Sequence, residues 1–396
     1  MNRRASRAVA ADSCPTTDTV SPYSDILNED VAFQSEILPL VSRTFALTIP
    51  QLPEPLCLAV SNAYLLCRIA DTIEDDVALT ARQKHRFHDV FTAVVGNQAS
   101  SESFAGQLYP LLSDRTLQAE RELVKRTPEI VRITQALNVR QRTALQRCVR
   151  IMCDGMPRFQ RNKSLSGLKD QHELDEYCYF VAGVVGEMLT ELFCDYSDEI
   201  AEHHDEMMRL SVSFGQGLQM TNILKDIWDD QQRAMCWLPA NLFEEAGYDT
   251  NNIKHQLRDE HFVAGLQQLI KLANAHLQNA LSYTLTIPDR HVGIRRFCLW
   301  ALGMAVMTLR KINKHPDFES SQQVKISRRM VKWVVGVSNT LTRRDGSLQA
   351  LYRWFSKALD QSPADIRSLL PDYSIISQWH QPVEIIPALA IDRQAS

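Results

Sequence analysis

Two clusters of carboxylates, far apart in the chain, are the side chains most able to do chemistry. The first reads Asp-Thr-Ile-Glu-Asp-Asp from Asp71, and the second reads Asp-Ile-Trp-Asp-Asp from Asp226. Residues four apart share one face of a helix, so Asp71 projects beside Asp75, and Asp226 projects beside Asp230 in the same way. Four carboxylates facing one cleft would repel one another unless cations stood between them. Hard oxygen ligands suit Mg²⁺ shared with phosphate oxygens, so the pattern predicts chemistry on a diphosphate.

The helix that carries the first cluster has a polar line on an otherwise apolar surface. Tyr64, Arg68, Asp71 and Asp75 fall within about 40° of one line on a helical wheel. An exposed, salt-bridged face would account for Arg68 and Asp71 three residues apart. The flanking residues 65–67 and 69–70 are apolar, however, which indicates a mostly buried helix whose charges need partners. We therefore favour cation binding over a solvated face.

The helix that carries the second cluster changes character along one stripe. Gln219, Asn222, Asp226 and Asp230 lie on a stripe about 80° wide, which continues backwards to Gly215 and Val212. A face that runs from small and apolar to polar to acidic fits an amphiphilic substrate with a hydrocarbon tail and an anionic head. The alternative is structural, with glycines allowing close helix packing and amides satisfying buried backbone groups.

A tyrosine stands on a third apolar face. Tyr177 shares one side of the predicted 171–198 helix with Val181, Val184 and Met188. A buried tyrosine is usually a core residue with one satisfied hydroxyl, and the residues alone favour that interpretation.

A basic group follows the polar stretch 315–323 and comprises Lys325, Arg328, Arg329 and Lys332. These side chains could pair with the phosphates of a dinucleotide. The chain has no Gly-x-Gly-x-x-Gly after a strand, which excludes a Rossmann domain, and solvated helix charge is the simpler interpretation.

Helices must position all of these residues, because apolar residues recur at three- and four-residue steps nearly throughout. The predicted helices cover 24–38, 55–76, 80–95, 103–125, 128–153, 171–198, 200–232, 253–285, 289–314, 322–342 and 346–359. Asn138 is a candidate N-cap that would divide the 128–153 helix, and Gly155 to Gly167 is predicted to be a loop. We predict one all-α domain over 23–360, a disordered tail over 1–22, and a C-terminal tail over 361–396 without a transmembrane helix.

Composition narrows the class of protein. The 396 residues carry a net charge of -4, with a pI near 6.3, which gives no basic footprint for nucleic acid. The nine cysteines lie mostly in apolar stretches and include no Cys-x-x-Cys pair, as in reduced cytoplasmic proteins. No run of 18 apolar residues occurs, so no transmembrane helix is expected.

Four segments together resemble the squalene/phytoene synthase family over residues 30–340. They read Ser-Arg-Thr-Phe from Ser42, Tyr-Leu-Leu-Cys-Arg from Tyr64 with the first acidic cluster, Tyr-Cys-Tyr-Phe-Val-Ala-Gly from Tyr177, and Gln-Met-Thr-Asn-Ile-Leu-Lys-Asp from Gln219. The form of the first cluster, and the Val-Lys-Ile-Ser-Arg segment from Val324, are most similar to soluble bacterial members that form squalene. Phe297 and Cys298 match the start of a motif associated with the second half-reaction, after which Leu299 and Trp300 replace the usual Pro-Gln pair.

The resemblance implies a single-domain isoprenoid synthase fold, with helices around a central cavity, and a prenyltransferase activity. Two farnesyl diphosphates would condense head to head to presqualene diphosphate, followed by NADPH-dependent reductive rearrangement to squalene, as in sterol or hopanoid biosynthesis. The implied cofactors are Mg²⁺ and NADPH. The implied enzyme is a cytoplasmic monomer that binds no nucleic acid and contacts a membrane only peripherally, for release of its product.

The resemblance also assigns roles to residues. Tyr177 would remove the proton that closes the cyclopropane of presqualene diphosphate. The other assigned catalytic residues, which also bind metal, are Asp71, Asp75, Asp226 and Asp230, with Glu74 as a further metal ligand. Substrate binding is assigned to Arg43, Phe45, Tyr64, Arg68, Val181, Val185, Gln219, Asn222 and Phe297. The cofactor phosphate is assigned to Lys325 and Arg328.

Two alternatives remain open at this point. The nearest is a sister enzyme of the same fold, a dehydrosqualene, phytoene or presqualene diphosphate synthase, which product analysis with and without NADPH would distinguish. The other is a non-catalytic family relative that acts as an assembly factor. Such a relative would be expected to lose the acidic clusters, and both are intact here.

Overall fold

A computed structural model describes residues 27–42, 44–160, 167–250 and 259–359. These residues are mostly helical and contain no β-strand, with one isolated bridge between Leu168 and Pro239. The predicted all-α class is confirmed. The tails predicted over 1–22 and 361–396 lie outside the described residues.

The helices of the first half of the chain are α1 (Asn28–Val41), α2 (Phe45–Thr48), α3 (Glu54–Asp75), α4 (Ala81–Val95), α5 (Ser101–Leu108), α6 (Gln118–Lys125), α7 (Thr127–Ala136), α8 (Val139–Gln160), α9 (Gln171–Cys178) and α10 (Val184–Tyr196). The remaining helices are α11 (Asp198–Ala201), α12 (His204–Gln232), α13 (Ala240–Glu245), α14 (Glu260–Thr286), α15 (Val292–Lys314), α16 (Ser321–Val324), α17 (Arg328–Leu341) and α18 (Asp345–Ser356).

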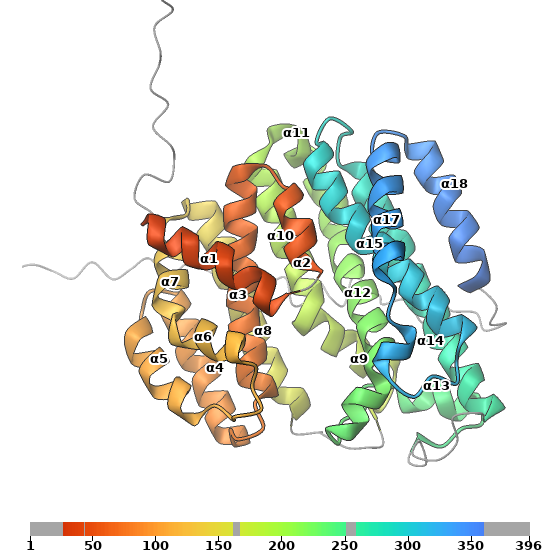
Figure 1. The fold of residues 1–396 in the computed structure, drawn as a ribbon, viewed down its shortest axis with the longest axis horizontal. Coiled ribbons are helices and arrows are strands. Elements are labelled where there is room, and N and C mark those ends of the chain that lie inside the picture. Colours follow the sequence, from red (N-terminus) through yellow and green to blue (C-terminus); the bar gives the residue numbers. More distant parts are fainter. Residues whose placement is uncertain (1–26, 43, 161–166, 251–258, 360–396) are drawn as a thin grey trace, which may run out of the picture.

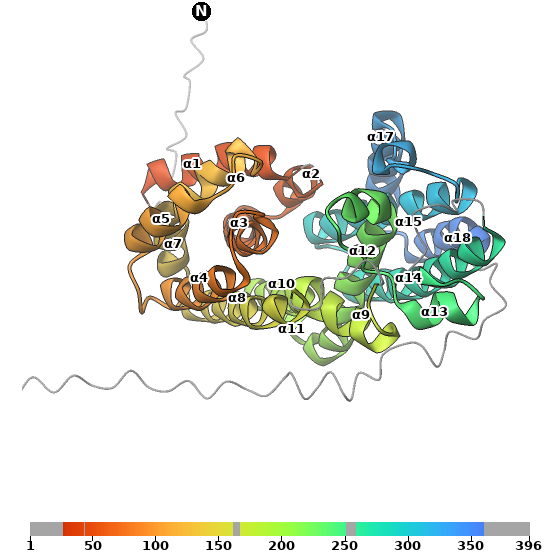
Figure 2. The ribbon, with the colours of Figure 1, turned by 90° about the horizontal axis from the view of Figure 1, so that it is seen from below.

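The helices form two groups joined by α10 (Figures 1 and 2). Helices α1 to α8 make up one group, and α12 to α18 make up the other. Helix α10 packs against α8 of the first group and against α12 of the second. As a result α3 and α12, which carry the two acidic clusters, belong to different groups that α10 brings together.

Close contact of α12 with α10, and with residue 182 just before α10, depends on two glycines. A Cβ atom at Gly215 would lie 2.2 Å from the backbone oxygen of Ala182, and one at Gly186 would lie 2.1 Å from that of Ser211. No side chain fits at such separations, so the two backbones can approach only because these residues are glycine. The structural interpretation of Gly215 is therefore correct for its packing.

Three predicted segments differ from the structure. The helix predicted over 322–342 is interrupted at residues 325–327, between α16 and α17. The helix predicted over 103–125 is broken between α5 and α6, because the Asp76 carboxylate accepts hydrogen bonds from the backbone N–H of Ser113 at 2.7 Å and from the Thr116 hydroxyl at 2.6 Å. The loop predicted from Gly155 is wrong up to Gln160, where α8 continues. Gly155 instead makes room for the Phe180 ring, which a Cβ atom would overlap.

The predicted division of the 128–153 helix is confirmed. The Asn138 side chain accepts a hydrogen bond of 2.9 Å from the backbone N–H of Gln141, which is N-terminal capping between α7 and α8.

A five-residue π turn, Tyr179–Gly183, joins α9 to α10 and changes which side chains share a face. Its wider turn moves Val184 into the core and places Val185 beside Val181 at a cavity. The face predicted from a regular helix, with Val184 next to Val181, is therefore wrong at that one position.

Three helical segments are long and apolar enough to span a membrane, namely α3, Gln171–Tyr196 and α15. Polar residues interrupt each of these segments, so none of them is an unbroken run of 18 apolar residues. In each, 67–72% of the apolar window is buried against other helices of the protein. Packing in the core therefore accounts for their composition.

Candidate active site

The two acidic clusters line one cavity of about 350 Å³ between α3 and α12. Glu74 joins the four predicted aspartates in its wall. The other residues of its lining are Arg68, Tyr177, Val181, Gln219, Asn222, Ile223, Lys225, Arg233, Met235 and Trp237. The sequence prediction that the clusters face a common space agrees with this arrangement.

On α3, Arg68 organises the approach to the first cluster. Its guanidinium lies 3.7 Å from Asp71 and 3.8 Å from Glu120 of α6, and it donates a hydrogen bond of 3.0 Å to the Tyr64 hydroxyl. The Tyr64 hydroxyl in turn donates to the backbone oxygen of Val41. Burial raises the pKa of Asp71 to about 6, although Arg68 opposes the shift, and the charges of Asp75 and Glu120 add to it.

Each α12 carboxylate in the cavity pairs with a basic residue close to it in sequence, Asp226 within the helix and Asp230 with the residue that follows the end of the helix. Lys225 lies 3.1 Å from Asp226, and Arg233 lies 2.5 Å from Asp230. Burial raises the pKa of Asp230 to about 6 against the effect of Arg233. Burial also raises the pKa of Asp226, with Lys225 opposing the shift.

The carboxylates suit a metal that is shared with its ligand. Among the described residues, no group of three His, Cys, Asp or Glu side chains is placed to enclose a cation by itself. Mg²⁺ is commonly held by one or two carboxylates, with substrate phosphates and waters completing its octahedron. Four carboxylates around one cavity fit that kind of binding, because a divalent cation would relieve their repulsion. Burial raises the pKa values of three of them, Asp71, Asp226 and Asp230.

An apolar cavity of about 230 Å³ continues from the acidic one. Phe45, Tyr64, Val181, Val185 and Phe297, which were predicted to bind substrate, line it. Gly215, Leu218, Gln219 and Asn222 of α12 line it as well, and the last two are shared with the acidic cavity. The predicted stripe from small to polar to acidic residues thus forms a continuous wall along α12.

Tyr177 lies where the acidic cavity meets the protein core. It is 7% exposed, and its ring stacks on Trp237 with centroids 4.0 Å apart and planes 7° apart. Burial, followed by the negative charges of Glu74, Asp75 and Asp230, raises its pKa well above the usual value for tyrosine. The phenol is therefore neutral at physiological pH, with carboxylates of both clusters around it.

A third cavity, of about 510 Å³, lies beside Asp226 and is bounded by α15 and the start of α17. Lys325 lines it, whereas Arg328 is exposed at the first turn of α17 and lines none of the three cavities of the site. The geometry therefore brings Lys325, but not Arg328, to the cavity wall. Lys325 shares this cavity with Arg68 and Lys225, and each of the three side chains could meet an anionic group there.

The altered segment after Cys298 faces two ways. Cys298 and Ala301 line the apolar cavity, whereas Leu299 and Trp300 point towards α17, where the Trp300 indole donates a hydrogen bond of 3.2 Å to the Asn339 side chain. The two residues that depart from the family pattern are thus part of the packing of α15 against α17.

Several residues in or beside the candidate site were not predicted from the sequence. Lys225 and Arg233 were not predicted, because basic side chains near acidic ones on a helix are usually solvent-exposed. Their spacing was nevertheless a signal, since Lys225 precedes Asp226 and Arg233 follows Asp230 by three residues. Glu120 and Trp237 come from distant segments, and no local pattern could have placed them. Arg43 was predicted to bind substrate and lies outside the described residues.

Comparison with known proteins agrees with this geometry. The family model for squalene/phytoene synthase matches residues 38–330. The squalene synthase of Gibberella zeae is 26% identical over 287 residues, which cover 71% of this chain but only 58% of that protein. A solved structure of TcSQS with a ligand has a TM-score of 0.69 at 24% identity and covers 89% of this chain and 100% of that chain.

A crystal structure of a dehydrosqualene synthase with a ligand has a TM-score of 0.60 at 19% identity and covers 83% of this chain and 100% of that one. These structural likenesses show the isoprenoid synthase fold.

Proposed function

Because the chain belongs to the squalene/phytoene synthase family, we propose that it is a prenyltransferase that joins two farnesyl diphosphates head to head. The product of this step would be presqualene diphosphate, which the same enzyme would convert to squalene with NADPH. The observation that carries the proposal is the wall of α12, which passes from Gly215 and Leu218 through Gln219 and Asn222 to Asp226 and Asp230. An apolar chamber that opens into a carboxylate-lined one matches a prenyl chain with a diphosphate head.

The carboxylates of α3 and α12 would hold the diphosphates at the polar end. Asp71 and Asp75 would act from one side, with Glu74 behind them, and Asp226 and Asp230 from the other. Bound Mg²⁺ would neutralise the leaving diphosphate and so favour ionisation of the allylic carbon. Arg68, Lys225 and Arg233 would turn from carboxylates to phosphate oxygens and add charge-assisted hydrogen bonds.

Tyr177 would accept the proton that is lost when the cyclopropane closes. A carbocation is a far stronger acid than a protonated phenol, so the neutral hydroxyl oxygen of Tyr177 can serve if its own proton passes to a diphosphate oxygen. Stacking on Trp237 fixes the ring, which holds the hydroxyl at one point of the cavity.

The apolar walls would protect the cations from water. Phe45 and Tyr64 pack with ring centroids 5.3 Å apart at one side, and Phe193 and Phe297 pack at 6.2 Å at another. Excluding water prevents capture of a cation as an alcohol.

NADPH would supply the hydride of the second half-reaction, and Lys325 at the wall of the 510 Å³ cavity would bind its phosphate. Arg328 would assist only from outside that cavity. We also propose that the enzyme acts as a monomer.

The test is product analysis with purified protein, farnesyl diphosphate and Mg²⁺, with and without NADPH. We expect presqualene diphosphate to accumulate without NADPH and squalene to form with it. No consumption of farnesyl diphosphate would contradict the prenyltransferase proposal. Geranylgeranyl diphosphate in place of the C15 substrate would test whether the chain is a phytoene synthase instead.

One structural observation favours a second candidate, a sister enzyme that makes dehydrosqualene or stops at presqualene diphosphate. Leu299 and Trp300 replace the Pro-Gln pair that usually follows the cysteine, and here they pack against α17. Dehydrosqualene in the absence of NADPH, or presqualene diphosphate whether or not NADPH is added, would identify that candidate.

A further inference from the structure

The outer face of α17 and α18 exposes two tryptophans on one surface. The Trp333 side chain of α17 is 42% exposed, and Trp354 of α18 is 66% exposed. Phe355 lies between them, with ring centroids 5.4 Å from Trp333 and 4.6 Å from Trp354. The two indoles are therefore held together by a shared aromatic contact, although they come from different helices.

The segment that forms these two helices concentrates positive charge on an acidic protein. Residues 325–357 contain eight Lys and Arg and one Asp, which gives a net charge of +7. Because the whole chain has a net charge of -4, the other residues together carry a net charge of -11. The single acid of this segment, Asp345, forms an ion pair of 2.6 Å with Arg295 of α15. Within the described part of the chain, no carboxylate lies within 4.0 Å of Arg343, Arg344 or Arg353.

We call this surface the α17–α18 face. It comprises Arg329, Lys332, Trp333, Arg343, Arg344, Arg353, Trp354 and Lys357.

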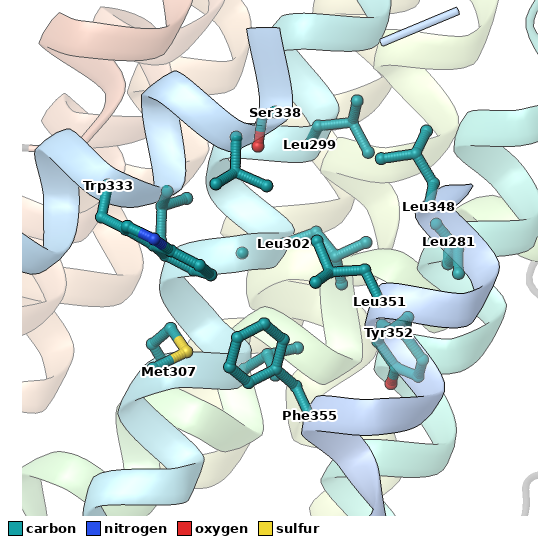
Figure 3. A pocket seen from close by; sticks show the side chains of 14 residues that line it. Leu281, Leu299, Leu302, Met307, Trp333, Ser338, Leu348, Leu351, Tyr352 and Phe355 are labelled. Carbon is teal, nitrogen blue, oxygen red and sulfur yellow. The ribbon is translucent and has the colours of Figure 1, made fainter. Parts of the chain in front are cut away.

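Helix α17 connects this face to the interior. Figure 3 shows the apolar cavity of about 70 Å³ beneath it, with Trp333, Leu351 and Phe355 around the space. On another side of α17, Val331 lines the 510 Å³ cavity that borders Asp226. One helix thus separates the largest cavity of the candidate site from the cationic and aromatic surface.

We propose that the α17–α18 face docks on an anionic lipid bilayer. Tryptophan favours the boundary between headgroups and acyl chains, and basic side chains are attracted to an anionic leaflet. Stable peripheral attachment needs both kinds of contact, and here both are present on one pair of helices. A second copy of the chain is a poor occupant, because a two-fold interface would place these cations against their own copies.

The inference rests on the proposed function in one respect: docking would let a hydrocarbon product pass from the enzyme into an apolar phase. Docking itself can be measured without turnover, so the two proposals can fail separately.

The experiment is flotation of the full chain with vesicles of phosphatidylcholine alone or mixed with phosphatidylglycerol. We expect binding to the mixed vesicles, weakened by salt, and little binding to the neutral ones. Changing Arg343→Glu together with Arg344→Glu should lower the partition into mixed vesicles about tenfold or more. Trp354→Ala should lower it severalfold, because less apolar area enters the interface.

The matched control is Arg82→Glu with Arg140→Glu, which changes net charge equally at exposed positions of α4 and α8. It should float like the wild type, and all variants should keep farnesyl diphosphate turnover in detergent solution. Absence of binding, equal binding to neutral vesicles, equal loss in the control, or binding to duplex DNA but not to vesicles would each overturn the proposal.

Discussion

The two acidic clusters differ in how their charges are balanced. On α12, Asp226 and Asp230 each have a basic partner close in sequence, Lys225 at 3.1 Å and Arg233, just after the helix, at 2.5 Å. On α3, Asp71 shares the more distant Arg68 with Glu120, and no basic side chain of the described residues lies within 4.0 Å of Asp75. The α3 cluster thus has the larger uncompensated negative charge, and we infer that it depends more on an external cation.

Each cluster also gives one acid to structure. Asp76 accepts hydrogen bonds from the backbone N–H groups of Ala78, Leu79 and Ser113 and from the Thr116 hydroxyl. Asp229 accepts one from Ser321, at the start of α16. Each run of acids therefore supplies both cavity-lining and structural carboxylates. Asp76 differs from its neighbours because it follows the last residue of α3, and Asp229 because it points from another side of α12.

The largest expected effect is loss of turnover when a carboxylate of either cavity wall is neutralised. Asp71→Asn and Asp226→Asn should each lower kcat about 10³-fold or more, because charge stabilisation of the leaving group is lost. Steady-state assays with farnesyl diphosphate would measure this, with circular dichroism to verify folding. Asp229→Asn is the matched control and should remain near the wild-type rate; a similar loss there would mean that the separation of roles within the cluster is wrong.

Tyr177 belongs to neither cluster and tests whether the chemistry between them needs its hydroxyl. Tyr177→Phe should slow formation of presqualene diphosphate about 10²-fold or more, as expected when a group that transfers a proton is removed. Single-turnover product analysis is the measurement. Unchanged formation would assign the tyrosine to packing against Trp237.

Stability should separate the two structural acids. Asp76→Ala removes the acceptor of four hydrogen bonds and should lower the free energy of unfolding by about 3 kcal/mol. Asp229→Ala removes one and should cost about 1 kcal/mol. Urea denaturation would show the order, and equal costs would remove this contrast between the clusters.

The smallest effect concerns pH in the metal-free protein. The pKa of Asp71 is about 6, above its value of about 3.9 in an unfolded chain, so its contribution to stability is present below pH 4 and is lost as pH rises through 6. At pH 7, Asp71→Asn should therefore stabilise the fold by about 1 kcal/mol after solvent screening, and at pH 4 the gain should vanish.

Asp230→Asn is the comparison for the pH experiment. Its free energy of unfolding at pH 7 should increase less than that of Asp71→Asn, because removing the charge of Asp230 also removes its ion pair with Arg233. Thermal denaturation at both pH values would measure the gains, and a larger gain for Asp230→Asn would reverse our ranking of the clusters.

Much of the architecture could be predicted. The helices that carry the clusters begin and end within a few residues of their predicted bounds, and the family assigned from four short segments is confirmed. The α12 stripe was predicted correctly because a regular helix of 29 residues keeps its phase from Gly215 to Asp230. The prediction failed where the helical repeat changes. At the π turn, Val185 lines the cavity beside Val181, and Val184, which was predicted to share that face, is buried in the core.

The sequence by itself determined the helices, the acidic faces and the glycines that let α10 meet α12, because each depends on residues a few positions apart. Only the tertiary structure decided that Asp76 and Asp229 are anchors, that Glu120 competes for Arg68, and that Lys325 reaches a cavity while Arg328 does not. These outcomes depend on hydrogen bonds and charges between segments distant in the chain, and no local periodicity encodes which distant group will arrive.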